Sequence, residues 1–172
     1  MRGAAQSALT ALLGIALIPG GPAAAQALDI VGTVAATPRL AAIGDEISDT
    51  GRIDLFSSDG PYTLLAFDSA AFLSLPARGR GGVLAAEGLV DRILRYHLLE
   101  GAYLLRDLRA EVELAGGTMD LETVQGETLT VILSGPEIVF MDAVGGTARI
   151  VQGNLEATNG IVHVIDTVLL PQ

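Results

Sequence analysis

The end of the chain constrains the fold more strongly than any other segment. Residues 161–170 are almost wholly apolar. The exceptions are His163, Asp166 and Thr167. A near-continuous apolar run is typical of a strand covered on both faces, whereas a strand with one wet face alternates apolar and polar residues. Asn159 and Gly160 precede the run and form a pair that readily closes a tight turn with positive φ. The sequence therefore predicts a buried final strand that is entered from a tight turn.

Upstream of this strand, the apolar residues change their spacing along the chain. Helical spacing predicts helices at 28–34, 38–50, 69–75, 83–99 and 104–108. Thr37, Asp68 or Ser69, Gly51 and Gly101 are the expected helix caps or stops. Short apolar segments between turn residues predict strands at 62–67, 119–121, 129–133, 138–140 and 148–150. This succession predicts the α+β class, with N-terminal helices packed against a C-terminal antiparallel β region in one domain, residues 28–172.

The first residues have the pattern of a secretory signal peptide. Arg2 precedes an apolar stretch at 8–18, and small residues follow it. Two Ala-x-Ala sites allow cleavage after Ala25 or after Ala27. The apolar stretch is well short of the roughly 20 residues that a spanning helix needs. An uncleaved amphipathic anchor is the alternative, although the segment has no charged face. We therefore expect residues 1–27 to be removed, leaving a secreted or periplasmic protein with no membrane span.

The composition restricts the partners. The chain has 20 acidic and 10 basic residues, a net charge of −10, and no cysteine. Every basic residue is arginine, which we interpret as the coding bias of a GC-rich bacterium. An acidic domain repels phosphate backbones and anionic membrane surfaces, so nucleic acid is not an expected partner. Without cysteine there are no disulfides, and the fold must depend on its hydrophobic core.

Templates for catalysis are absent from the sequence. Without cysteine and lysine, thiol and amine nucleophiles are excluded. None of the serines lies in a Gly-x-Ser-x-Gly motif, and neither a phosphate-binding loop nor a calcium loop is present. We therefore expect no enzyme, no catalytic residue and no cofactor.

The two histidines and one aspartate need separate interpretations. His97 and His163 could form a metal pair or an acid–base pair, or each could be a structural histidine bonded inside the core. The 65 residues between them and the lack of a second ligand nearby favour the structural reading, so we expect no metal site. Asp166 lies in the apolar run and is predicted to be buried, capping a turn or meeting an arginine such as Arg95. Asn159 is predicted to be a turn former.

Three segments carry a resemblance to a known family. Residues 60–76 run from Gly-Pro-Tyr-Thr to Leu-Pro, residues 95–101 contain a Tyr-His pair, and residues 154–171 contain the closing strand. Together, in this order and spacing, they resemble the fasciclin domain. One departure is Phe67-Asp68-Ser69, which stands where the family has Pro-Thr followed by Asp or Asn. The change retains an oxygen for a helix cap and adds an aromatic ring.

The resemblance implies a function and a set of residues. It implies a single-domain, bacterial fasciclin-like protein that mediates cell adhesion or surface recognition, with a cell-surface or matrix protein or glycan as partner. A monomer is the expected state. By resemblance, Tyr96 and His97 support the fold, although the Tyr-His element has been tied to integrin-dependent adhesion in animal relatives. The family residues expected to be structural are Tyr96, His97, Asn159, Gly160, His163 and Asp166.

Loops are the expected contact surfaces, because loops carry binding on rigid scaffolds. Two are candidates, at 57–61 and 77–82. Their contact residues would be Asp59, Gly60, Pro61, Arg78 and Arg80. The alternative function is a periplasmic small-ligand carrier or envelope sensor, with a pocket for an apolar or sugar-like molecule.

Overall fold

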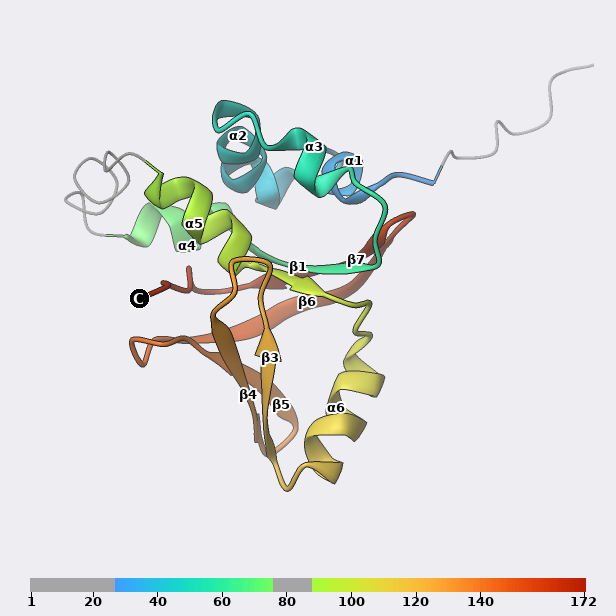
Figure 1. Cartoon of the computed structure of the whole chain (residues 1–172), viewed down its shortest axis with the longest axis vertical. Coiled ribbons are helices and arrows are strands. Elements are labelled where there is room, and N and C mark those ends of the chain that lie inside the picture. Colours follow the sequence, from blue (N-terminus) through green and yellow to red (C-terminus); the bar gives the residue numbers. More distant parts are fainter. Residues whose placement is uncertain (1–26, 76–87) are drawn as a thin grey trace, which may run out of the picture.

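A computed structural model of the protein describes residues 27–75 and 88–172 (Figure 1). The helices are α1 (Ile30–Ala35), the 3₁₀ turn η1 (Pro38–Leu40), α2 (Ala41–Asp49), α3 (Ile53–Phe56), α4 (Ser69–Ser74), α5 (Leu89–Tyr96) and α6 (Leu105–Leu114). The strands are β1 (Tyr62–Phe67), β2 (Leu98–Glu100), β3 (Thr118–Glu122), β4 (Thr128–Ser134), β5 (Glu137–Met141), β6 (Thr147–Ala157) and β7 (Gly160–Ile165). The α+β class follows from this mixture.

These strands form one seven-stranded sheet, in the order β2-β1-β7-β6-β5-β4-β3. The pair β1 and β7 is parallel, with Tyr62 opposite Gly160 and Phe67 opposite Ile165, and the other pairs are antiparallel. The C-terminal strands β3 to β7 are antiparallel, as expected, but β1 and β2 from the preceding part of the chain join the same sheet, which was not expected. Strand β1 is apolar on both faces, so it enters the sheet beside β7, where helices cover it.

The helices are divided between two places along the sheet (Figure 1). Helix α1 contacts β6, β7 and α2, and α2 contacts α4, so these elements lie together over the β1–β7 part. Helix α6 lies at the other part and contacts β3 and β4. Between the two parts, β6 pairs with both β5 and β7.

The buried final strand is confirmed. Every residue of β7 is buried, and five of the six residues of β1 are buried too. The strand ends at Ile165, earlier than the apolar run does, and Val168 and Leu169 remain buried beyond it. Strands β1 and β7 therefore contribute many residues to the core, and burial continues past the end of β7.

The predicted helix at 83–99 is too long at its C-terminal end. Helix α5 ends at Tyr96, and Leu98 pairs with Leu64 as the start of β2. Gly101 ends β2 instead of capping a helix, and its N–H donates to the Pro61 carbonyl at 2.9 Å. Its φ of +104° favours glycine there. Residues 98–100 have helical spacing in the sequence but form a strand, because the edge of β1 offers their backbone groups hydrogen-bond partners.

Two predicted caps have different outcomes. Asp68 caps α4 as expected, because its carboxylate accepts from the Ala71 N–H at 2.9 Å. That bond holds the pKa of the Asp68 carboxyl below its ordinary value. Thr37 makes no cap bond; its hydroxyl donates to the Thr33 carbonyl at 2.8 Å. Pro38 then starts the turn η1, which leads into α2.

Some expectations concern residues beyond those described. The loop at 77–82, with Arg78 and Arg80, lies outside the described residues, as does nearly all of the predicted signal peptide. Within residues 27–75 and 88–172, no helix has both the length and the apolar character needed to cross a membrane.

Candidate functional site

The loop before β1 and the turn between β6 and β7 touch through two glycines. A Cβ added to Gly60 would lie 2.0 Å from the Asn159 carbonyl oxygen, and one added to Gly160 would lie 2.0 Å from the Tyr62 carbonyl oxygen. Neither Asn159 nor Gly160 adopts the left-handed conformation that we expected of this turn. The glycines are needed because two backbones approach closely here.

Asn159 holds this arrangement together with its side-chain amide. Its Oδ1 accepts from the Ile30 N–H at 2.9 Å, and its Nδ2 donates to the carbonyls of Phe56 and Ser58, both at 2.9 Å. The turn is therefore fastened to the start of α1 and to the end of α3. The prediction of a turn former was incomplete, because Asn159 joins segments about 100 and 130 positions away.

A shallow hollow of about 510 Å³ lies where the loop and the turn meet, and we call it the glycine hollow. Its lining comprises Asp59, Gly60, Pro61, Ala102, Ala157, Thr158, Asn159, Gly160 and Ile161. Asp59, Gly60 and Pro61 are exposed, and Asp59 is the charged side chain among the lining residues. The structure thus brings one predicted contact loop together with two predicted family residues. Ala102 was missed, since an alanine has no chemical character that marks it in the sequence.

His97 is fully buried and has a defined protonation pattern. Its Nδ1–H donates to the Ile93 carbonyl at 2.7 Å, and its Nε2 accepts from the Leu169 N–H at 3.2 Å. The ring also packs edge-on against Phe67, with centroids 5.3 Å apart. Burial lowers the pKa of His97 from 6.5 to about 4, because the charged form would lose its hydration. A neutral histidine therefore ties the end of α5 to the segment after β7.

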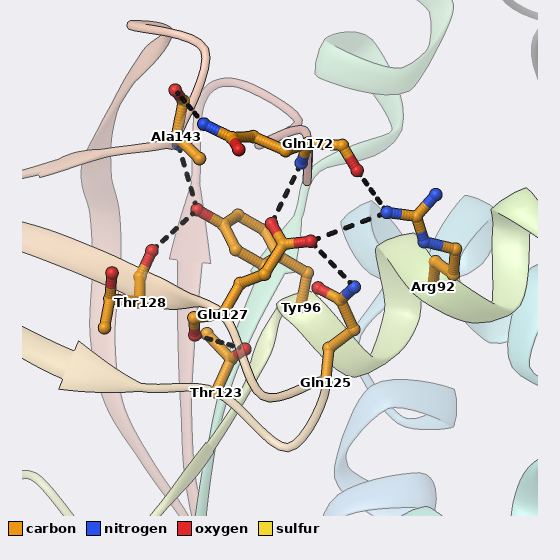
Figure 2. Close-up of polar contacts among 8 residues, drawn as sticks. All are labelled: Arg92, Tyr96, Thr123, Gln125, Glu127, Thr128, Ala143 and Gln172. Atoms are coloured by element: carbon orange, nitrogen blue, oxygen red, sulfur yellow. Dashed lines mark hydrogen bonds and ion pairs between the residues drawn. The ribbon is translucent and has the colours of Figure 1, made fainter.

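Tyr96 lies beside His97 in the sequence but bonds to different elements. Its ring is fully buried, and its hydroxyl donates to the Thr128 carbonyl at 3.1 Å and accepts from the Ala143 N–H at 3.2 Å (Figure 2). Burial raises the pKa of the Tyr96 hydroxyl above its ordinary value. Both donor and acceptor capacities of the Tyr96 hydroxyl are used inside the protein, and these bonds tie α5 to β4 and to the turn after β5.

A polar cluster holds the segment after β7 (Figure 2). The Glu127 carboxylate accepts from the backbone N–H of Gln172 at 2.9 Å and from Nε2 of Gln125 at 3.0 Å. Arg92 bonds to the Gln172 carbonyl and lies 3.5 Å from Glu127. The Gln172 N–H, above all, holds the pKa of the Glu127 carboxyl below its ordinary value. This cluster fastens backbone and therefore has a structural role.

His163, in β7, bonds to the segment before α6 and to β6. Its Nε2–H donates to the Tyr103 carbonyl at 2.7 Å, and its Nδ1 accepts from the Asn154 N–H at 3.1 Å. Asn154 has a φ of +59°, and its Oδ1 accepts from the Leu105 N–H at 2.9 Å. Burial lowers the pKa of His163. His163 thus positions the bulged part of β6 against the start of α6.

The two histidines therefore have separate partners. Each ring bonds to backbone at both nitrogens, and the two rings carry their protons on opposite nitrogens. Among residues 27–75 and 88–172, no three His, Cys, Asp or Glu side chains are grouped as metal ligands would be. The described geometry favours the structural interpretation of both histidines.

Asp166 was predicted to be buried, and this was wrong. It is exposed just after β7, where its carboxylate accepts from the Arg149 N–H at 2.8 Å and from the Thr167 hydroxyl at 3.0 Å. No bond to Arg95 is present; Arg95 pairs instead with Asp91 at 3.1 Å. The run leaves the core at Asp166 because the strand ends one residue earlier, which frees the side chain to face water.

Comparisons with known proteins agree with this geometry. Residues 39–171 match the Fasciclin domain. The chain belongs to the fasciclin domain family. The fold also resembles the solved FAS1 domain pair from the insect cell adhesion molecule Fasciclin I, with a TM-score of 0.60 and 24% identity over 76% of this chain and 45% of that one.

Relatives of known name share parts of the sequence. The transforming growth factor-beta-induced protein ig-h3 of Sus scrofa is 34% identical over 73% of this chain, which spans only 17% of the pig protein. The cell surface glycolipoprotein MPB83 of Mycobacterium bovis is 32% identical over 89% of this chain and 66% of its own length. The family is thus found both in animal proteins and at bacterial cell surfaces.

Proposed function

We propose that the protein is a secreted or periplasmic interaction module that mediates cell adhesion or surface recognition through the glycine hollow. The observation that carries the proposal is the meeting of the loop at Asp59–Pro61 with the turn at Asn159–Gly160. Family membership supports an adhesion-related domain. Residues 1–27 would serve as the signal peptide, and the domain would act by binding, without catalysis.

The hollow has the properties of a preorganised contact surface. Asn159 fastens its backbone to two other segments through three hydrogen bonds, so little conformational freedom remains to be lost on binding. It offers exposed backbone and one carboxylate, that of Asp59. These groups suit hydroxyl groups of a glycan or a basic side chain of a surface protein, which would bond to the carboxylate.

The printed names of relatives support this role. MPB83 is named a cell surface glycolipoprotein, and Fasciclin I a cell adhesion molecule. By analogy, we place this protein outside the cytoplasm, at or near a cell surface. The partner would be a surface or matrix protein or a glycan, bound by a monomer.

Bead attachment tests the proposal. Beads coated with the protein are applied to cells of the source organism and to a host matrix, with an unrelated protein of similar acidity as control. Asp59→Arg should abolish attachment above that control, because it reverses the charge of the hollow. Asp49→Arg, at an exposed acid at the end of α2, is the matched control and should attach like the wild type.

Both variants should keep the wild-type unfolding midpoint, since both side chains are exposed. Equal attachment by the Asp59 and Asp49 variants would refute the role of the glycine hollow. Arg78→Ala and Arg80→Ala then test the second predicted loop.

A further inference from the structure

Three arginines line a second hollow, whose lining residues differ from those of the glycine hollow. It has a volume of about 470 Å³ and lies between α6 and the strands β5 and β6. We call it the arginine hollow; its lining comprises Leu105, Arg106, Arg109, Pro136, Glu137, Ile138, Arg149 and Ile150. Its lining has three arginines and one carboxylate, whereas the whole chain has 10 basic residues against 20 acidic ones. Asp107 and Glu113, outside the lining, pair with Arg106 and Arg109.

The hollow also has an apolar part. Leu105 and Ile150 are half-buried, and Ile138 is 7% exposed. They belong to three different elements, α6, β6 and β5. An apolar surface lined by cationic side chains matches a molecule that is apolar at one end and anionic at the other. The volume falls in the range of about 300–1,000 Å³ that is typical of small-molecule sites.

Arg106 and Arg149 are held only weakly by their present partners. Arg106 pairs through Nε with Asp107 at 3.1 Å, and Arg149 pairs through Nε with Glu137 at 3.5 Å. All four side chains are about half exposed or more. Exposed pairs of this kind contribute little stability, and each guanidinium has five N–H donors. A ligand oxyanion can therefore engage these groups without breaking a strong interaction.

The walls of the hollow are positioned by bonds deeper in the protein. The Leu105 N–H donates to Oδ1 of Asn154, which fixes the first turn of α6 on the bulge of β6. Gly153 lies against the same leucine, since an added Cβ would come within 2.5 Å of Leu105 Cδ1. Arg109 bonds to the Pro136 carbonyl, which links α6 to the turn between β4 and β5. The site is thus formed before any ligand binds.

We propose that the arginine hollow binds an amphiphilic anion, with a carboxylate or phosphate head on the arginines and an alkyl chain on the apolar residues. The bidentate geometry of a guanidinium suits both heads, which could come from a free fatty acid or from a phosphate-bearing lipid fragment. This site is independent of the adhesion role of the glycine hollow.

Titration with soluble probes tests the proposal. Octanoate and octyl phosphate are added to the protein, and amide chemical shifts are followed by NMR. Both should shift Ile138 and Ile150, and at least one should bind about tenfold or more tightly than 1-octanol and than acetate, because each control lacks half of the recognised chemistry. The head that binds more tightly identifies the source of the ligand.

Variants distinguish binding at this site from non-specific binding elsewhere on the protein. Arg106→Gln with Arg149→Gln should weaken octanoate and octyl phosphate binding about tenfold or more, with no change in fold. Arg39→Gln, which also removes an arginine paired with an aspartate, is the matched control and should bind like the wild type. Equal binding by the double variant, equal binding of 1-octanol, or equal binding of acetate would each overturn the proposal. Bead attachment should be unaffected by the double variant.

Discussion

Two parts of the sheet differ in burial and in strand direction: the part around β1 and β7, and the part around β3, β4 and β5. In the first part the strands are buried almost throughout, and β1 and β7 run parallel. In the second part burial alternates along β4, and all pairs are antiparallel. One part is covered by several short helices, and the other is flanked by α6 (Figure 1).

This difference explains where the family likeness lies. The Gly-Pro segment, His97 and the closing strand meet around β1 and β7, where side chains bond to backbone from distant segments. The Tyr96 hydroxyl reaches from there to Thr128 and Ala143 in the second part. The arginines of the other hollow instead reach exposed carboxylates. The residues that carry the resemblance therefore also hold the fold, whereas Arg106 and Arg149 of the arginine hollow are held by exposed pairs only.

The largest effect should come from Gly160→Ala. The new Cβ would lie 2.0 Å from the Tyr62 carbonyl oxygen, so two paired strands must separate. We expect a loss of about 4 kcal/mol or more in the free energy of unfolding, measured by urea denaturation. Gly44→Ala in α2 is the control and should gain about 0.5–1 kcal/mol, because its nearest neighbour is a side-chain carbon at 3.4 Å. Similar stabilities of the two variants would contradict the close approach.

The next effect concerns pH and His97. The pKa of His97 is about 4 when folded and 6.5 when unfolded, so the unfolded state binds more protons between these values. The stability that His97 contributes is thus complete above pH 6.5 and falls as the pH drops toward 4, by roughly 3 kcal/mol. His97→Ala should lose about 1–3 kcal/mol at pH 7 and show a flatter pH dependence. Urea unfolding midpoints at pH 7 and pH 4.5 measure the loss of stability and its pH dependence. The same change between the two pH values in the variant and the wild type would exclude a contribution of His97 to the pH dependence.

A smaller loss is expected for Asn159→Ala. The variant removes three bonds of 2.9 Å and leaves the Ile30 N–H and two carbonyls to find water. We expect the free energy of unfolding, measured by thermal unfolding, to fall by about 2 kcal/mol. Hydrogen exchange at Ile30 should also become faster. Unchanged exchange there would show that the tie to α1 does not depend on the amide.

The smallest effect should come from Arg149→Gln. Its side chain is 64% exposed and its pair with Glu137 spans 3.5 Å, so stability should change by less than about 0.5 kcal/mol. The unfolding midpoint checks this. A loss comparable to that of Asn159→Ala would remove the contrast between the two parts of the sheet.

Local pattern predicted several elements well. Strand β1 has the predicted bounds, because a short apolar run lies between a Gly-Pro loop and a capping aspartate. Strand β2 could not be predicted, since three residues after a helix become a strand only because β1 lies beside them. The length of β6 was missed as well, because its polar second half is held by pairing with β7.

The sites were harder to predict than the fold. The loop at Asp59–Pro61 could be chosen as a contact surface from its composition, but the turn that completes the hollow is about 100 positions away. Arg106 and Arg109 share a helix face by their spacing, whereas Arg149 joins them only through the path of β6. Sequence separation hides such groupings, because only the sheet topology brings their members together.

The bond between Asn159 and Ile30 also has a mechanical consequence for an adhesive domain. The adjacent Thr158 N–H donates to the Leu28 carbonyl at 2.8 Å, so two hydrogen bonds couple the first described segment to the β6–β7 turn. The lining residues Thr158 and Asn159 of the glycine hollow are therefore coupled to the first described segment. If this hollow is the contact surface that we propose, a displacement of Leu28 or Ile30 would disturb it directly.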